Sequence, residues 1–356
     1  MLLNDLTIEN FRSFEKYKLD KLARVNLLVG DNNCGKTSVL EALRLLVARD
    51  KIGTILHMLE LREDFDHVSV GTGTPETYEV RFDGSSLFHQ GMIAESFDDF
   101  RTIKLSANAK KKLQMVVQVQ QSSNQPTAEM VTRSSPGSEE ERGESITMHA
   151  RGLLARPWER WPIEWKSMNN DVRGAYFLSA FNRSTEQLAA MWEKVIEDKR
   201  ESHVLSALQV INEAYLGVIF SPRTETLRDI HIDIGSERIS MSLLGNGIEL
   251  MLRAGIALAS SKSSFLLIDE IDTGLHYSRL ADMWKMVITA AKNLDVQVFA
   301  TTHSLDCIRG LSEAVRNDES FTEEVAVFRI DRRTDHAIRF GGEELEIIVE
   351  NEIEVR

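Results

Sequence analysis

The chain has 356 residues, of which 42% are apolar and 27% are charged, and its formal net charge is −13. This composition is typical of a globular protein with a sizeable core, and the length allows one elaborated domain or two. The acidic balance argues against broad electrostatic adhesion to DNA or to an anionic membrane, although it leaves room for one basic face.

The cysteine content and the apolar runs favour an intracellular protein. Cys34 and Cys307 are the only cysteines, so no disulfide framework is indicated. No uninterrupted apolar run approaches the ~18 to 20 residues of a membrane span, and the N-terminal sequence lacks the order of a signal peptide. We therefore expect a cytoplasmic protein without a membrane partner.

The beginning of the chain predicts the order strand, glycine loop, helix. Residues 2–11 alternate in polarity, and residues 24–30 form a compact apolar run that ends at glycine. Such a run is typical of a strand that is buried on both faces. Residues 37–50 predict an amphipathic helix, because their apolar residues recur at helical spacing.

The remainder divides by composition into further parts of a single head. The N-terminal lobe, residues 1–120, ends in alternating segments that predict antiparallel strands. Residues 121–147 are rich in Ser, Glu, Gln and Pro, and we predict a flexible loop because little burial offsets its ordering entropy. Residues 148–225 predict a helical insert. Strands and helices alternate in the C-terminal lobe, residues 226–356, which favours a parallel sheet with covering helices.

The glycine loop, GDNNCGKTS, satisfies the pattern G-x-x-x-x-G-K-[ST]. Its glycines let successive N–H groups point at one anion, Lys36 can reach the outer phosphates, and the Thr37 hydroxyl can coordinate Mg²⁺. A chance match is the alternative, but the strand before the loop and the helix after it favour a phosphate site. The predicted nucleotide-binding residues here are Gly30, Asn32, Asn33, Cys34, Gly35, Lys36, Thr37 and Ser38.

Two later apolar strands end in residues that suit phosphate chemistry. The segment SFLLIDE ends in Asp269, a candidate Mg²⁺ ligand, and Glu270, a candidate general base. The segment VQVFATTHS ends in His303, whose imidazole could bond a terminal phosphate. A solvated acidic turn and a structural histidine are the alternatives. We predict Glu270, His303 and Lys36 as the catalytic residues.

The segment SLLGNG precedes another predicted helix and could form a second anion site. Ser242 would supply a hydroxyl, and Gly245 and Gly247 would flank the N–H groups at the start of the helix. A simple helix cap is the alternative. This site and the glycine loop cannot serve the same phosphate unless a partner brings one of them.

These motifs together resemble a known family. The segments IENFRSFEK, GDNNCGKTS, SLLGNG, LLIDEIDTGLH and ATTHS occur in the order seen in ABC-type ATPases of the RecF, SMC and OLD group, and they look most like the OLD-like AAA ATPases of bacterial and phage defence systems. The resemblance spans residues 3–304. It implies an α/β fold: a P-loop core with a parallel sheet and covering helices, an antiparallel β subdomain and a helical subdomain.

The resemblance also implies a mechanism with ATP and Mg²⁺ as cofactors. Two subunits of a homodimer, or of a higher homo-oligomer, would close head to tail over two ATP molecules, so that the Ser242 segment of one faces the glycine loop of the other. Asp272 would lie across the interface as the D-loop residue, and Arg12 would lie near the nucleotide. The glutamine-loop residue stays open among Gln114, Gln118, Gln120 and Gln121.

We predict an ATP-driven switch that controls a separate effector, a nuclease or a toxin, in defence against phage or foreign DNA. Full-length OLD proteins carry a nuclease domain after the ATPase, and the residues that follow His303 are too few for one. The alternative is a RecF-like repair ATPase that binds duplex DNA directly, to which Lys110 to Lys112 and Arg151, Arg156 and Arg160 could contribute. A transporter subunit is disfavoured by the SLLGNG segment, and an inert ATP-binding scaffold by Glu270.

Overall fold

The protein is described by a computed structural model. The structure describes residues 2–48, 53–55, 58–59, 62, 65–69, 78–82, 84–89, 101–109, 112–121, 127–136, 142–149, 153–155, 175–179, 185–209, 212–222, 228–244, 246–260 and 265–350.

The centre of the molecule is a six-stranded sheet with the strand order β11-β15-β16-β3-β17-β18. Neighbouring strands from β11 to β17 run parallel, and β18 is antiparallel to β17. The strands are β3 (Val25–Val29), β11 (Ala175–Ser179), β15 (Phe265–Asp269), β16 (Gln297–Thr301), β17 (Val325–Arg329) and β18 (Ile338–Gly341).

The apolar runs form strands here because both faces of this sheet are covered. In β3, Leu27 belongs to the hydrophobic core on one face and Leu28 to the core on the other. All five residues of β3 and of β16 are buried. Since β3, β15 and β16 are parallel, their carboxyl ends meet at one edge of the sheet, where open α/β sheets bind ligands.

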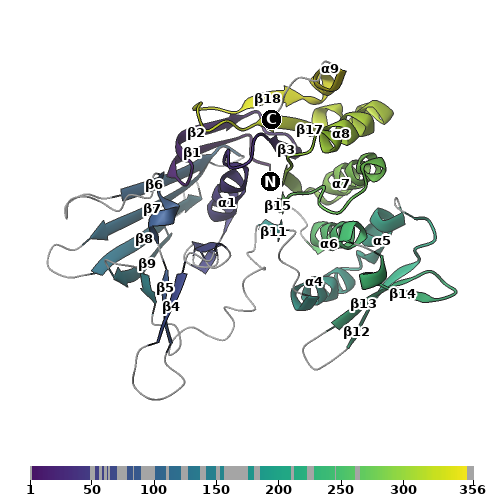
Figure 1. Ribbon diagram of the computed structural model, residues 1–356, viewed down its shortest axis with the longest axis horizontal. Helices are drawn as coiled ribbons and strands as arrows, with labels where there is room; N and C mark the ends of the chain where they lie inside the picture. The colour runs from purple at the N-terminus through teal and green to yellow at the C-terminus, as the bar shows by residue number, and fades with distance from the viewer. Residues whose placement is uncertain are drawn as a thin grey trace.

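Helices cover the two faces unequally (Figure 1). Helix α1 (Lys36–Val47) lies between the central sheet and the antiparallel sheet of the N-terminal lobe. The other face is covered by α6, α7 and α8, with α4 and α5 packed against α6 and α9 against α8. Their bounds are α4 Thr185–Glu197, α5 Glu201–Gln209, α6 Asn246–Ser260, α7 Leu280–Leu294, α8 Leu305–Asn317 and α9 Leu345–Glu350.

A second six-stranded sheet is antiparallel and has the order β2-β1-β6-β7-β8-β9. Its strands are β1 (Asp5–Phe11), β2 (Phe14–Asp20), β6 (Arg101–Ala107), β7 (Leu113–Gln121), β8 (Thr127–Pro136) and β9 (Arg142–His149). The described residues also form two three-stranded sheets. They contain β4 (Phe65–Ser69), β5 (Tyr78–Phe82) and β10 (Leu153–Ala155), and β12 (Gly217–Pro222), β13 (Arg228–Asp233) and β14 (Arg238–Ser240).

The expected fold class is confirmed: a parallel core with covering helices is joined to an antiparallel β part and a helical part. The flexible loop predicted over residues 121–147 is wrong for the described residues, because β8 and β9 occupy most of it. Ladder hydrogen bonds pair β8 with β7 and β9 with β8, and the Thr, Val and Ile residues of the two strands favour extended chain. The predicted helical insert, residues 148–225, also contributes β11 to the central sheet.

Among the helices of the described residues, none combines the length and the apolar character that crossing a bilayer requires.

Candidate nucleotide-binding site

The loop between β3 and α1 is bent by residues with positive φ. Gly30 has φ 141°, Asn33 has φ 61° and Gly35 has φ 107°. A Cβ atom on Gly35 would lie 2.4 Å from Cζ of Phe14, so the ring packs directly on the Gly35 backbone. Only glycine combines this backbone angle with this close approach. The β1–β2 hairpin thereby fixes the loop at the N-terminus of α1.

Lys36 is directed back into this loop. Its ammonium donates hydrogen bonds to the carbonyl oxygens of Gly30 at 2.7 Å and Asp31 at 2.8 Å. The Cys34 sulfur lies 4.0 Å from Nζ, and burial raises the pKa of this thiol. The charge of Lys36 is therefore placed inside the curve of the loop, where phosphate oxygens could replace the two carbonyls.

The end of β15 is tied to the start of α1 and to the end of β16. The Thr37 hydroxyl lies 3.2 Å from Oδ2 of Asp269, and the Thr301 hydroxyl donates to Oδ1 of Asp269 at 2.6 Å. Asp269 thus receives hydroxyls from two neighbouring elements. The structure brings together the two residues predicted to bind a metal, Thr37 and Asp269, and both supply oxygen, the donor that Mg²⁺ prefers.

Glu270 follows in a strained backbone conformation, with φ 56°. Left-handed backbone in a non-glycine residue costs free energy and must be held by its surroundings. The Glu270 N–H donates to Oγ1 of Thr301 at 2.9 Å, and the Thr273 hydroxyl donates to Oε2 of Glu270 at 3.2 Å. These bonds hold the predicted general base at the edge of the sheet.

Asp272 is held by Thr302, the residue that precedes His303 in the chain. The buried Thr302 hydroxyl donates to Oδ1 of Asp272 at 2.6 Å, and the Ser304 N–H donates to the same hydroxyl at 3.0 Å. His303 lies between Thr302 and Ser304 in the chain, and its side chain is exposed. The carboxylate expected to act across a dimer interface is thus held by its own chain, beside the predicted histidine.

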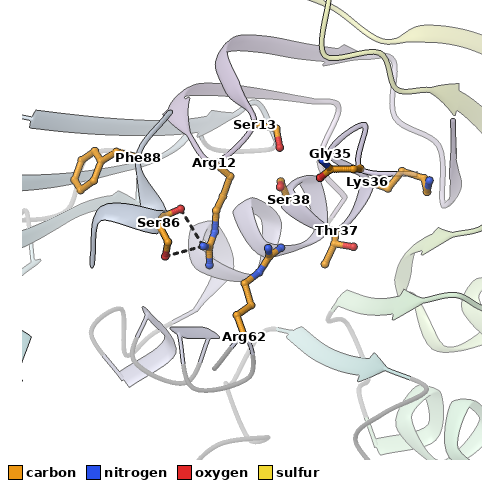
Figure 2. Close-up of a pocket in the computed structure, with 10 residues that line it drawn as sticks. Arg12, Ser13, Gly35, Lys36, Thr37, Ser38, Arg62, Ser86 and Phe88 are labelled. Carbon is orange, nitrogen blue, oxygen red and sulfur yellow. Dashed lines mark hydrogen bonds between the residues drawn. The ribbon is translucent and has the colours of Figure 1, made fainter. Parts of the chain in front are cut away.

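A cavity of about 670 Å³ opens beside the glycine loop (Figure 2). Arg12 enters it from the turn between β1 and β2, with φ 51°, and its Nη1 donates to the carbonyl oxygen of Ser86 at 2.9 Å and to the Ser86 hydroxyl at 3.0 Å. The resemblance predicts Arg12 near the nucleotide, and here it lines one cavity with the loop. The lining residues are Arg12, Ser13, Asn33, Gly35, Lys36, Thr37, Ser38, Arg62, Ser86 and Phe88.

None of the described residues of the SLLGNG segment lines this cavity. Ser242 and Leu243 belong to a short 3-10 helix, Met241–Leu243, and Leu243 is 79% exposed. Gly247 is buried at the start of α6, where a Cβ would lie 2.6 Å from the carbonyl oxygen of Gly274, so the helix start packs on the turn after Glu270. Gly245 lies outside the described residues.

The glutamine-loop candidates are not brought to the cavity among the described side chains. Gln114 is exposed and Gln118 is half-buried on β7, while the side chains of Gln120 and Gln121 lie outside the described part. Sequence reasoning missed the roles of Thr301 and Thr302, although both precede His303 in the quoted ATTHS segment. It also missed Arg62, Ser86 and Phe88, for which no local pattern gave a signal.

Comparisons with known proteins agree with this geometry. Residues 1–153 match a family model described as "AAA ATPase domain", and residues 202–306 match one described as "AAA domain, putative AbiEii toxin, Type IV TA system". The chain is 25% identical to an "ATP/GTP phosphatase" of Helicobacter pylori over 99% of both chains. These matches support a P-loop ATPase of the ABC/SMC-like kind.

Two further similarities are narrower or more distant. A "DNA replication and repair protein RecF" of Leptospira interrogans is 50% identical over 46 residues, which is 13% of this ATPase and 13% of that protein. A solved SMC head "bound to the C-winged helix domain of ScpA" is 11% identical, covers 98% of this ATPase and 100% of its own chain, and has a TM-score of 0.49.

Proposed function

We propose that this ATPase dimerises around ATP and acts as a switch that controls a separate effector, a nuclease or a toxin, in defence against phage or foreign DNA. The dimer is supported by the position of the Ser242 segment relative to the pocket. The described lining residues all come from the N-terminal part of the chain, whereas Ser242 and Gly247 stand on the other lobe, with Leu243 exposed beside Ser242. A second copy, arranged head to tail, would place its Ser242 segment over this pocket.

The effector is supported by the comparisons. Residues 202–306, which include Ser242, Glu270 and His303, match the family whose description names a putative toxin of a type IV toxin–antitoxin system. That description belongs to those relatives. From it we take only the proposal that this chain acts in a defence system with a toxin-type effector. The resemblance to OLD-like ATPases of defence systems agrees with this proposal.

In the proposed mechanism, Lys36 turns from the carbonyls of Gly30 and Asp31 to the outer phosphates of ATP. Thr37 and Asp269 would hold Mg²⁺, which when bound neutralises charge on the phosphates. Glu270 accepts a proton from the attacking water. His303, exposed at the end of β16, would bond the terminal phosphate and report its loss to the partner-facing turn through Thr302 and Asp272.

The dimer is tested by mixing two variants, Lys36→Ala and Ser242→Arg. Each alone should be inactive, because one lacks the lysine and the other blocks the opposing segment. A mixed dimer has one intact site, so mixing should restore activity up to about a quarter of the wild-type rate if the sites act independently. Ser236→Arg, on an exposed turn of the same lobe, is the matched control.

Light scattering of Glu270→Gln with and without MgATP gives the second readout. A shift from monomer to dimer with MgATP supports the proposal. A protein that hydrolyses ATP as a monomer, with no shift and no complementation, would refute it. The effector is tested by co-purifying the chain with the products of neighbouring genes and assaying their activity. Equal effector activity in the presence of the wild-type protein and of Lys36→Ala would refute the proposal that ATP binding switches the effector.

A RecF-like role is the second candidate, favoured by the 46-residue matches to RecF proteins. It predicts direct binding of duplex DNA that weakens steeply with salt. Of the basic residues named for it, Lys112 is exposed just before β7, and the others lie outside the described part of the chain. No binding to duplex DNA at low salt, measured by fluorescence anisotropy, would dismiss this candidate.

A further inference from the structure

Two arginines that line the nucleotide pocket share one buried carboxylate. Glu41 lies in the first half of α1, and 7% of its side chain is exposed. Its Oε2 lies 3.2 Å from Nε of Arg12. Arg62 approaches the same carboxylate with two donors, Nε at 2.7 Å from Oε1 and Nη2 at 3.1 Å from Oε2. The two guanidinium groups therefore meet at the same oxygen.

We infer that Arg62 contacts the bound nucleoside triphosphate and that Glu41 is the positioning residue that holds Arg62 and Arg12 in the wall of the pocket. The inference rests on the proposed function in one respect, namely that ATP occupies this cavity. It adds two residues to the site, Arg62 and Glu41, that no motif in the sequence indicates.

The balance of charge suits an anionic ligand. Glu41 offers one negative charge to two guanidinium groups, and Lys36 adds a third cation to the same cavity wall. A cavity lined by an excess of one charge attracts the opposite charge, more strongly where water is partly excluded. Triphosphates fit this excess, whereas an uncharged nucleoside gains nothing from it.

The two arginines differ in how firmly they are held. Arg12 is 5% exposed and is bonded to both oxygens of Ser86, so its guanidinium is a fixed part of the wall. Arg62 is 37% exposed, and its pair with Glu41 engages Nε and Nη2. A guanidinium has five N–H donors, so further donors can face a ligand while the pair persists.

Figure 2 shows where those donors point. The Arg62 side chain rises from beneath α1, and its guanidinium is directed to the side of the pocket where Thr37 and Ser38 lie. The first turn of α1 is where phosphate groups bind in a loop of this pattern. Arg62 therefore stands on the path from the first turn of α1 to the Ser86 and Phe88 end of the cavity.

Binding of MgATP, measured by calorimetry on the full chain, tests the assignment. Arg62→Ala should weaken binding about tenfold, the size of one charge-assisted hydrogen bond. Arg62→Lys should retain part of the affinity because the charge remains without the planar donors. Arg309→Ala, a half-exposed arginine on α8, is the matched control and should match wild type. In steady-state hydrolysis, Arg62→Ala should raise KM and leave kcat within about twofold, as for uniform binding.

Glu41→Gln tests the positioning role, because it keeps the shape of the side chain and removes its charge. It should weaken MgATP binding, and the double variant Glu41→Gln with Arg62→Ala should bind no more weakly than the weaker single variant. If Glu41→Gln does not fold, the affinities of Arg62→Ala and Arg62→Lys for MgATP test the inference without it. Wild-type affinity in Arg62→Ala would overturn the inference and leave the proposed function standing. If Arg62→Ala weakens MgATP binding as expected but the protein controls no effector, only the proposed function is refuted and the inference about Arg62 stands.

Discussion

Thr301 joins both acidic residues of the candidate catalytic edge, and replacing it with valine should disable them together. Its hydroxyl donates to Asp269 at 2.6 Å and accepts the N–H of Glu270 at 2.9 Å. Valine has nearly the same shape but no hydroxyl, so the substitution removes these two bonds and leaves the packing of β16 intact. Thr301 is 1% exposed, so water has little access to replace them.

The expected cost follows from the two bonds. A hydrogen bond to a charged group contributes ~1.5–3 kcal/mol and a neutral one ~0.5–1.5 kcal/mol, so Thr301→Val should destabilise the fold by about 2–4 kcal/mol. The strained φ of Glu270 would also lose one of its supports. Misplacing both carboxylates should lower kcat by about 10- to 100-fold, which corresponds to roughly 1.4–2.7 kcal/mol of barrier.

Steady-state ATP hydrolysis and urea unfolding measure the two effects separately. Thr301→Ser keeps the hydroxyl and loses only a methyl group, so its kcat should stay close to that of wild type. A Thr301→Val protein with wild-type kcat and wild-type stability would show that neither bond holds the carboxylates. Equal losses of kcat in the serine and valine variants would mean that packing, and not the hydroxyl, is responsible.

Lys36→Ala should abolish detectable MgATP binding in calorimetry, because the loop loses its cation, whereas Lys292→Ala on α7 should bind normally; equal affinities would contradict the phosphate site. Glu270→Gln should lower kcat at least about 100-fold with little change in ATP affinity, as expected for loss of a general base; an unchanged kcat removes that role. Hydrogen bonds from Arg333 lower the pKa of Asp331 to about 2. A depressed carboxyl pKa contributes stability above the unfolded pKa and loses it as pH falls through the folded pKa. The stability advantage of wild type over Arg333→Ala in urea unfolding should therefore shrink between about pH 4 and pH 2; a constant difference would contradict the pairing.

The local motifs were readable because each lies within a short stretch of chain. The glycine loop between an apolar strand and an amphipathic helix predicted β3 and α1, since periodicity and glycine positions are local properties. Composition misled over residues 127–136, which form β8 although Met130 and Val131 are their only large apolar residues. A strand that adds to an existing sheet is held by backbone hydrogen bonds to its neighbour, and these depend little on side-chain type.

By itself, the sequence determined which residues end the buried strands: Lys36 and Thr37 after β3, Asp269 and Glu270 at β15, and His303 after β16. Only the tertiary structure decided which residues meet around them. The Glu41 carboxylate pairs with both Arg12 and Arg62. Arg62 lies 21 residues after Glu41 in the chain, and Arg12 lies on the separate turn between β1 and β2. Such a contact depends on the packing of α1 between two sheets, so it cannot be predicted from the spacing of these residues along the chain.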